Sequence, residues 1–439
     1  MFGLASTFGT RRDQGIRGLF AALDVGSSTV TCLLCHANGR GEVQVIGMGT
    51  RRAEGFSNGN VVNAPAAQQS ILNAINQAEE VAGETTERVV LCANAGRPHS
   101  RLVELELEID GSQVNQSHIN SLQHYAKQPL DVERQGEKVI AERLNTMVID
   151  YAIDGREGIQ DPRGMSANVL QAKYLVVTAQ KSALQSLIDC VERCHLSVSN
   201  VIATPLASAF GALNEEERQH GATLIDFGAQ CTSIAAYHGG RPVHVEVLPT
   251  GSDLLTSDLA AALSCSLNDA ERVKCLHGAA FLRPTDASVD VSVPSIDPLE
   301  APTVVTRAYL VDVIQARLDE LFDRIAKRLD HPKLLPFSSK RIVLTGGGSA
   351  LVGIKDYVAL RLGRATRLGR PVALDGISRM QLTPAQTSVV GTVCLATRHE
   401  AGAEALNKPQ TPARQRGLFS NRASSSAMNI NPLATDNQA

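Results

Sequence analysis

The stretches LFAALDVG (residues 19–26) and ATLIDFG (residues 222–228) decide the fold. Each is an apolar strand that ends in an aspartate, one further residue and a glycine turn. A return strand follows each stretch, at residues 29–36 and 231–237, and a third apolar run follows each return strand. The same three-strand pattern therefore occurs twice, roughly 200 residues apart, which predicts an internal duplication of one α/β domain.

The turns of these two hairpins favour phosphate binding. Gly26 and Gly228 let the backbone approach an anion closely, and successive backbone N–H groups in such a turn form an anion-binding concavity. The carboxylates of Asp24 and Asp226 would repel a phosphate unless a cation lay between them. Two acids that face one cleft predict a hydrated Mg²⁺ ion, which takes few carboxylates and keeps several waters.

A third element is VLTGGGS (residues 343–349), in which a strand leads into a glycine turn and then a helix. Gly346, Gly347 and Gly348 would leave backbone exposed, so that a base and a ribose can lie on it. A glycine triplet alone is a weak signal, because turns commonly contain glycine. The order and spacing of the three elements together predict a nucleotide cleft between two duplicated α/β domains.

The rest of the chain predicts a smaller subdomain and two terminal segments. With 439 residues, the chain is too long for one ordinary core. Between residues 94 and 172 an alternating strand and a polar helix replace the apolar texture, and we interpret this region as an inserted α/β subdomain. The predicted division is a flexible N-terminus over 1–18, a first domain over 19–93 and 173–213, the insert over 94–172, a second domain over 214–398 and a disordered tail over 399–439.

Composition argues against several classes of protein. The net charge is −3, aromatic residues make up 4% and tryptophan is absent, so we expect no nucleic-acid partner. The nine cysteines lie in apolar segments, which is typical of reduced, cytosolic thiols. Cys32 and Cys35 should point to opposite faces of one strand, which disfavours a zinc site. We predict neither a secretory signal nor a membrane span.

These residues resemble the superfamily of actin, chaperone ATPases and sugar kinases, and most closely the FtsA family of bacterial division proteins. The similarity extends over residues 19–396. The stretches that carry it are DYAID (150–154), GI (158–159), PRGM (162–165), QAK (171–173), VERCHLSV (191–198), TSDLA (256–260) and DAE (269–271).

The resemblance implies an actin-like fold, ATP binding with Mg²⁺ and polymerisation. It implies a place on the cytoplasmic side of the inner membrane at the septum, where the protein binds the tail of the tubulin-like protein FtsZ and recruits later division proteins through the insert. Carried over by position, the cofactor-binding residues are Asp24, Gly26, Ser27, Ser28, Asp226, Gly228, Gln230, Thr232, Gly251, Glu271, Lys274, Gly346, Gly347 and Gly348, and the water-mediated metal ligands are Asp24 and Asp226.

This chain departs from the family pattern in three places. The second hairpin carries Ala229 and Gln230 where the family usually has glycines, and Thr204 stands where hydrolytic relatives place an acid or an amide. We therefore assign no catalytic residue and predict at most a slow ATPase, with ATP acting as a structural and assembly ligand. The chain also lacks a C-terminal basic amphipathic helix, so membrane contact would depend on residues 414–419 or 1–8.

The helix expected over residues 303–329 is where the family contacts the FtsZ tail, and Arg307 matches a position of that contact. Two alternatives remain open. One is a sugar kinase of the same superfamily, although no acid near the first hairpin marks a base for a sugar hydroxyl. The other is an actin-like component of pilus assembly. A P-loop NTPase is disfavoured, because the chain contains no Gly-Lys dipeptide.

Overall fold

The computed structural model describes residues 16–39, 41–126, 132–134, 137–296, 301–330, 341–377 and 382–397. Its first sheet has five strands. The meander β1–β2–β3 is antiparallel, and β6 runs parallel to β1 with Asp24 opposite Cys92. In spatial order the sheet contains β13 (Ser197–Ala203), β6 (Arg88–Ala93), β1 (Arg17–Val25), β2 (Thr29–Asn38) and β3 (Val43–Arg52).

The second sheet has nine strands and repeats the meander in β14–β15–β16, with β19 parallel to β14. The predicted duplication is thus confirmed in topology. In spatial order the sheet contains β11 (Arg156–Ile159), β10 (Ala141–Ile153), β12 (Val169–Gln180), β7 (His99–Glu108), β16 (Arg241–Leu248), β15 (Thr232–His238), β14 (Ala222–Phe227), β19 (Arg341–Thr345) and β20 (Ala365–Leu368).

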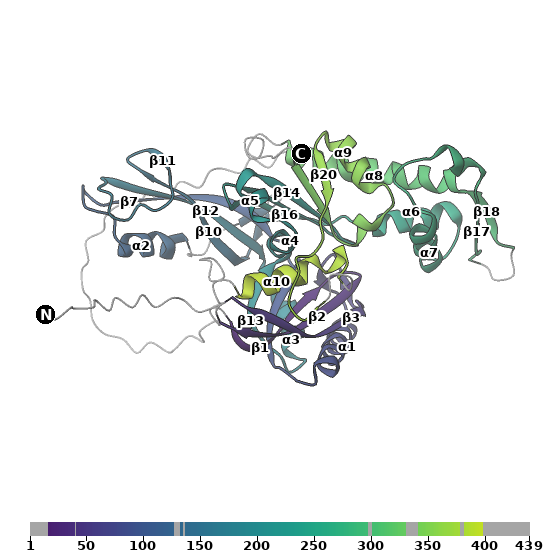
Figure 1. Cartoon of the computed structure of the whole chain (residues 1–439), viewed down its shortest axis with the longest axis horizontal. Coiled ribbons are helices and arrows are strands. Elements are labelled where there is room, and N and C mark those ends of the chain that lie inside the picture. Colours follow the sequence, from purple (N-terminus) through teal and green to yellow (C-terminus); the bar gives the residue numbers. More distant parts are fainter. Residues whose placement is uncertain are drawn as a thin grey trace.

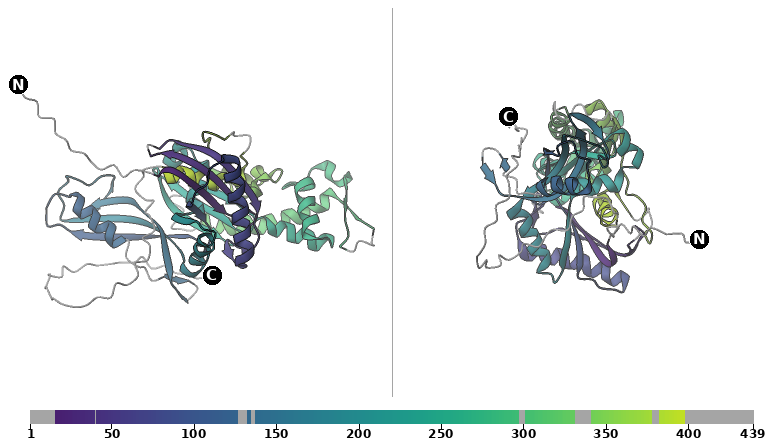
Figure 2. Two further views of the ribbon diagram at one scale, coloured as in Figure 1. Left: turned by 90° about the horizontal axis from the view of Figure 1, so that it is seen from below. Right: turned by 90° about the vertical axis from the view of Figure 1, so that its left-hand side faces the viewer.

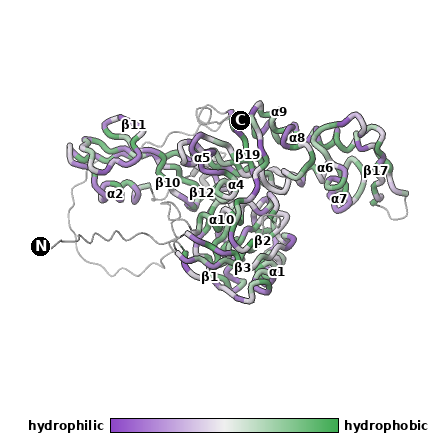
Figure 3. The backbone as a smooth tube through the Cα atoms, in the orientation of Figure 1, coloured by the Kyte–Doolittle hydropathy of each residue, from purple (hydrophilic) through white to green (hydrophobic). Residues whose placement is uncertain are grey.

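Helices cover both faces of each sheet. On the outer face of the first sheet, α1 (Ala64–Ala82) and α3 (Lys181–Glu192) bury an apolar stripe. On the outer face of the second, α6 (Asp253–Leu263), α8 (Arg307–Leu329) and α9 (Ile354–Leu362) do the same. We call the five-stranded sheet with its helices α1 and α3 the first lobe. The second lobe consists of β14, β15, β16, β19 and β20 with helices α6, α8 and α9 (Figure 1). Figure 3 shows the hydrophobic segments concentrated where the helices meet the sheets.

Two helices cross between the lobes. α4 (Thr204–Ala212) follows β13 but packs on the second sheet, whereas α10 (Thr387–Thr397) comes at the end of the second lobe and packs on the first sheet. The helices touch through glycine: an added Cβ at Gly391 would lie 1.7 Å from the carbonyl oxygen of Ala207. This contact holds the turns of both hairpins toward one cleft.

The inserted region forms an arm that projects from the lobes (Figures 1 and 2). It contains β7, α2 (Gln116–Ala126), β10, β11 and β12, and the paired strands β8 (Val132–Arg134) and β9 (Glu137–Val139). A bridge between His99 and Glu246 joins its sheet to β16. The predicted boundary between the insert and the first domain, at residues 172 and 173, lies within β12, which is one continuous strand. Side chains of β12 alternate between the arm core and the core of the first lobe.

Other element boundaries also differ from the sequence pattern. Residues 303–306, predicted as helix, form β18 and pair with β17 (Asp290–Val293), so α8 begins at Arg307. β1 begins at Arg17, inside the predicted N-terminal segment, and residues 1–15 and 398–439 lie outside the described residues. Cys32 and Cys35 are buried in separate clusters on opposite faces of the first sheet, as predicted. No helix of the described chain is long and apolar enough to cross a membrane.

Candidate functional site

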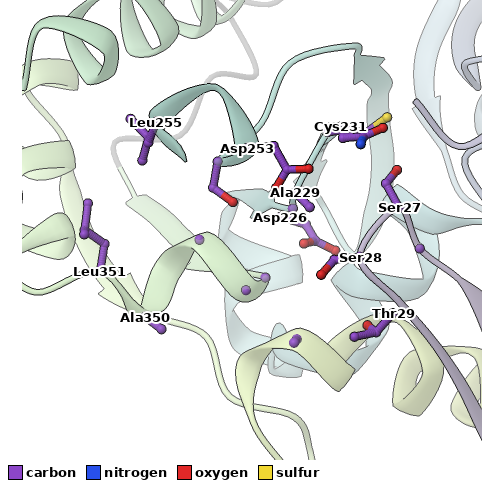
Figure 4. Close-up of a pocket in the computed structure, with 18 of the residues that line it drawn as sticks. Ser27, Ser28, Thr29, Asp226, Ala229, Cys231, Asp253, Leu255, Ala350 and Leu351 are labelled. Carbon is purple, nitrogen blue, oxygen red and sulfur yellow. The ribbon is translucent and has the colours of Figure 1, made fainter. Parts of the chain in front are cut away.

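A cavity of about 370 Å³ lies between the lobes, where the two hairpins and the glycine triplet meet (Figure 4). Ser27, Ser28 and Thr29 of the first hairpin face Asp226 and Ala229 of the second, and Leu255, Ala350 and Leu351 form the opposite end. Many of the predicted site residues line it: Asp24, Gly26, Ser27, Ser28, Asp226, Gly228, Gln230, Glu271, Lys274, Gly346, Gly347 and Gly348.

The two hairpins have the same backbone geometry. The amide of Gly26 donates to the carbonyl of Thr29, and the amide of Gly228 donates to the carbonyl of Cys231, each at 3.1 Å. A Cβ at either glycine would lie 2.9 Å or 2.7 Å from that carbonyl oxygen. Both turns therefore need glycine because a side chain would collide with the turn itself.

The carboxyls of Asp24 and Asp226 end β1 and β14 at the base of the cavity. Oδ2 of Asp24 accepts a hydrogen bond of 2.5 Å from Ser388 of α10, and Oδ2 of Asp226 accepts one of 2.5 Å from Ser208 of α4. Burial raises the pKa of each carboxyl to about 6, and the hydroxyl bonds work in the opposite direction. Within the described residues, no group of three or more His, Cys, Asp or Glu side chains could hold a metal directly.

The glycine triplet turns sharply beneath the second hairpin. Gly346 has φ +85°, and an added Cβ would lie 2.3 Å from Oδ1 of Asp226. An added Cβ at Gly348 would lie 2.4 Å from the ring of Phe227, whereas at Gly347 it would meet only the Cβ of Ala385, at 4.0 Å. Gly346 and Gly348 therefore bring the turn close to β14, while Gly347 faces open space at the cavity.

A charged cluster lies beside the apolar end. Nζ of Lys274 on α7 (Leu267–His277) is 2.6 Å from Oε2 of Glu271 and donates to Oγ1 of Thr256 at 2.8 Å. Burial opposes ionisation of Glu271, but hydrogen bonds from Lys274 and Thr256 hold its pKa below the usual range. These contacts fix both side chains at the cavity wall.

Two predicted residues do not line the cavity. Thr232 is 1% exposed, and its hydroxyl donates to the carbonyl of Thr250 at 2.8 Å. Gly251 packs beneath the second hairpin, where an added Cβ would lie 2.4 Å from the carbonyl oxygen of Ala229. Both residues support the second hairpin from behind.

Thr204 lines the cavity at the first residue of α4 and accepts a hydrogen bond from the thiol of Cys92 at 3.4 Å. Sequence reasoning missed several lining residues, because no local motif marks them: Asn94, Cys231, Ser233, Asp253 and Ser388. Ser388 in particular reaches Asp24 only through the crossing of α10 over the first sheet.

Arg307 lies away from this cavity, near one end of the second lobe. Its Nη1 is 3.2 Å from Oδ1 of the fully buried Asp286, and its Nε donates to the carbonyl of His277 at 2.9 Å. Its side chain is only 20% exposed. Arg307 therefore joins α8 to the turn η1 (Pro284–Ser288) and to the end of α7.

Family comparisons agree with this architecture. The model described as "Cell division protein FtsA" matches residues 223–391, and the model described as "SHS2 domain inserted in FTSA" matches residues 95–178. The second match covers most of the arm.

Solved structures with similar folds include a PilM–PilN type IV pilus biogenesis complex, with TM-score 0.60, 18% identity and coverage of 87% of this chain and 99% of that chain. MreB5 of Spiroplasma citri bound to ADP gives TM-score 0.52, 13% identity and coverage of 85% and 95%. Likenesses at this level of identity show the fold, and they confirm the predicted actin-like architecture.

Curated relatives match most of the chain. The cell division protein FtsA of Rhizobium meliloti (strain 1021) is 33% identical over 384 residues, which cover 84% of this chain and 85% of that protein. The FtsA of Escherichia coli (strain K12) is 30% identical over 383 residues, covering 85% and 89%. The predicted resemblance is confirmed, and the chain belongs to the FtsA family of cell division proteins.

Proposed function

We propose that this division protein binds ATP with Mg²⁺ in the cleft and uses the nucleotide as an assembly ligand. The duplicated hairpins support the proposal most strongly, because they present two glycine turns and two carboxyls to one cavity. Asp24 and Asp226 would hold Mg²⁺ through water, and the ion would neutralise the phosphates beside them. Glu271, Lys274 and Gly347 would meet the ribose and base.

Titration calorimetry with ATP tests this binding. We expect Mg²⁺ to raise ATP affinity, and Asp226→Ala to remove most of that gain because one of two carboxyls facing the ion is lost. Equal ATP affinity in Mg²⁺ and in excess chelator would contradict the proposal.

Slow hydrolysis follows from the groups available near the phosphates. Thr204 can orient a water through its hydroxyl but is a poor base, because a threonine hydroxyl does not take up a proton near neutral pH. In the second hairpin, Ala229 and Gln230 stand where the family usually has glycines. Their Cβ atoms narrow the space through which a phosphate would approach the backbone amides of that turn. ATP would then act by holding the lobes in their closed arrangement rather than by turnover.

Binding of the FtsZ tail is proposed at the end of the second lobe formed by α7, β18 (Thr303–Thr306) and α8. Exposed apolar side chains gather there, among them Leu276 (65% exposed), Val304 (61%) and Tyr309 (43%). A small hollow of about 150 Å³ lies beside them, bounded by Asp269, Arg272, Val273, Leu276, His277, Ser292, Pro294 and Pro302. This apolar surface next to the basic side chain of Arg272 suits a short amphipathic peptide.

Filament formation and recruitment of later division proteins are proposed for the arm. Deletion of residues 94–172 is a poor test, because it would cut β12 within the strand. The remaining part of β12 contributes Leu175 and Val177 to the first-lobe core, so the deletion would disturb that core as well. A sharper test is charge reversal on the exposed face of the arm, at Glu106 and Glu108 of β7. We expect Glu106→Lys with Glu108→Lys to prevent filaments on lipid; unchanged filaments would argue against an arm contact at this face.

We also retain the predicted domain division and the predicted location at the cytoplasmic face of the inner membrane at the septum as proposals. The segments proposed to reach the membrane, residues 1–8 and 414–419, lie outside the described residues. Liposome co-sedimentation with and without residues 401–439 tests the tail, and equal binding would direct attention to residues 1–8.

A further inference from the structure

A small hairpin of the first lobe reaches the edge of the nucleotide cleft. It consists of β4 (Phe56–Ser57) and β5 (Asn60–Val61), joined by Asn58 and Gly59 with φ +49° and +77°. Two consecutive positive φ values are the signature of a type I′ turn, in which the ladder bond joins the residues that flank the turn. The backbone N–H of Asn58 therefore has no partner within its own hairpin.

That N–H is satisfied from the other lobe. Asn58 N donates to Oε1 of Gln230 at 2.8 Å, across 172 positions of sequence. Gln230 belongs to the second hairpin turn and lines the cavity. A second bond crosses nearby, from Oγ of Ser233 to Oδ1 of Asn94 at 3.2 Å. The β4–β5 turn packs on Asn94, since an added Cβ at Gly59 would lie 3.0 Å from the Cβ of Asn94.

The bond also orients the amide of Gln230. A backbone N–H can only donate, so the oxygen of the amide must face Asn58. Nε2 is then the other end of the side chain, and it donates to no residue in the described part of the chain. Nε2 is thus a hydrogen-bond donor available at the phosphate end of the cavity.

We propose that Gln230 and the N–H of Asn58 form a clasp that joins the lobes and aims the Gln230 amide at the terminal phosphate of a nucleoside triphosphate. The proposal rests on ATP binding in the cleft. The side-chain donor would stand in for backbone donors that a glycine-rich second turn would supply. Its position depends on the first lobe, so this donor is in place only when the lobes are closed. The clasp would favour a triphosphate over a diphosphate.

Two substitutions at Gln230 separate the role of its acceptor oxygen from the role of its donor nitrogen. Gln230→Leu removes both the acceptor and the donor at similar volume. Gln230→Glu keeps an oxygen that can accept from Asn58 but replaces the donor by a second, negatively charged oxygen. Gln77→Leu is the matched control, because Gln77 also accepts a backbone amide, that of Thr50 at 3.0 Å, and does not line the cavity.

The first measurement is hydrogen exchange of the Asn58 amide in the full chain without nucleotide. We expect Gln230→Leu to speed this exchange at least about fivefold, the factor that corresponds to losing one hydrogen bond. Gln230→Glu should leave it within about twofold. Gln77→Leu should speed exchange at Thr50 and leave Asn58 unchanged. Equal Asn58 exchange in the wild type and Gln230→Leu would overturn the clasp.

The second measurement compares the affinities for ATP and ADP, each with Mg²⁺. Both Gln230 variants should lose ATP affinity more than ADP affinity, and Gln230→Glu should lose the most because its carboxylate repels the terminal phosphate. We expect the ratio of the two affinities to fall at least about fivefold. An unchanged ratio in Gln230→Glu would overturn the phosphate role. A wild-type chain that binds neither nucleotide would refute ATP binding itself, while the Asn58 exchange would still decide the clasp.

Discussion

The hydroxyl of Ser388 donates to Oδ2 of Asp24 at 2.5 Å, although 364 positions separate the two residues. Ser208 makes the same contact with Asp226 from the other crossing helix. Each of these two carboxyls is therefore held by a helix that belongs, by chain order, to the opposite half of the molecule. A change in the crossing of α4 and α10 would therefore alter the hydrogen bonds that both carboxyls accept.

Ser388→Ala should weaken Mg²⁺-dependent ATP binding at pH 7. The hydroxyl stabilises the ionised form of Asp24, so its loss raises the pKa of that carboxyl further above its present value of about 6. Raising the pH to 8.5 should restore part of the affinity. Thr397→Val is the control on the same helix, because the Thr397 hydroxyl bonds the carbonyl of Val393 at 2.9 Å within its own helix. A loss that is equal at both pH values would indicate a purely structural effect.

Lower pH should weaken Mg²⁺-dependent binding and stabilise the metal-free protein. Both carboxyls have pKa values raised to about 6, mainly by burial, from an ordinary value of 3.8. The folded state thus binds more protons than the unfolded chain, so their contribution to stability is full below pH 3.8 and is lost as pH rises through 6. Urea unfolding at pH 7 and pH 5 should show a larger gain on acidification in the wild type than in Asp24→Asn with Asp226→Asn.

Gly391→Ala should lower the stability of the fold, whereas Gly347→Ala should lower nucleotide affinity without lowering stability. At Gly391 the new methyl would lie 1.7 Å from the carbonyl oxygen of Ala207, so the helix crossing must shift, at a cost of about 1–3 kcal/mol or more. At Gly347 the methyl enters open space, so stability should be retained while nucleotide affinity falls. Thermal unfolding and nucleotide titration of both variants check this pair. A fully stable Gly391→Ala protein would show that the crossing is loosely packed.

Arg307→Glu should destabilise the second lobe rather than report on FtsZ binding. It would break the pair with Asp286, whose side chain is 1% exposed, and place two carboxyls together, for which about 3–5 kcal/mol is the expected cost. Tyr309→Ser removes an exposed ring and should lower affinity for the FtsZ tail without changing the melting temperature. An unchanged affinity in a peptide titration would move the proposed contact away from Tyr309.

Thr204→Ala should change ATP turnover little. The Thr204 side chain is 5% exposed, and a threonine hydroxyl does not act as a base near neutral pH. Steady-state turnover of the wild type should lie below the ordinary enzyme range of about 1 per second or more. A rate within that range would show that another lining group, such as Asp253, activates the attacking water.

Local sequence determined the hairpins. An apolar strand that ends in Asp-x-Gly has few alternatives, because the turn needs glycine and the strand must be buried. The glycine triplet after β19 and the helical part of residues 303–329 were also predicted from local sequence. These features depend on residues that are close together in the chain.

Tertiary structure alone decided how these parts meet. Ser388 reaches Asp24, and Gln230 reaches Asn58, only because two crossing helices bring distant segments to one cleft. β12 could not be assigned to one unit from its pattern, because its two faces serve different cores. Arg307 likewise resembles a surface cation in sequence, yet a buried aspartate from another element holds it. Periodicity reports which face of an element is buried, but not which neighbour covers that face.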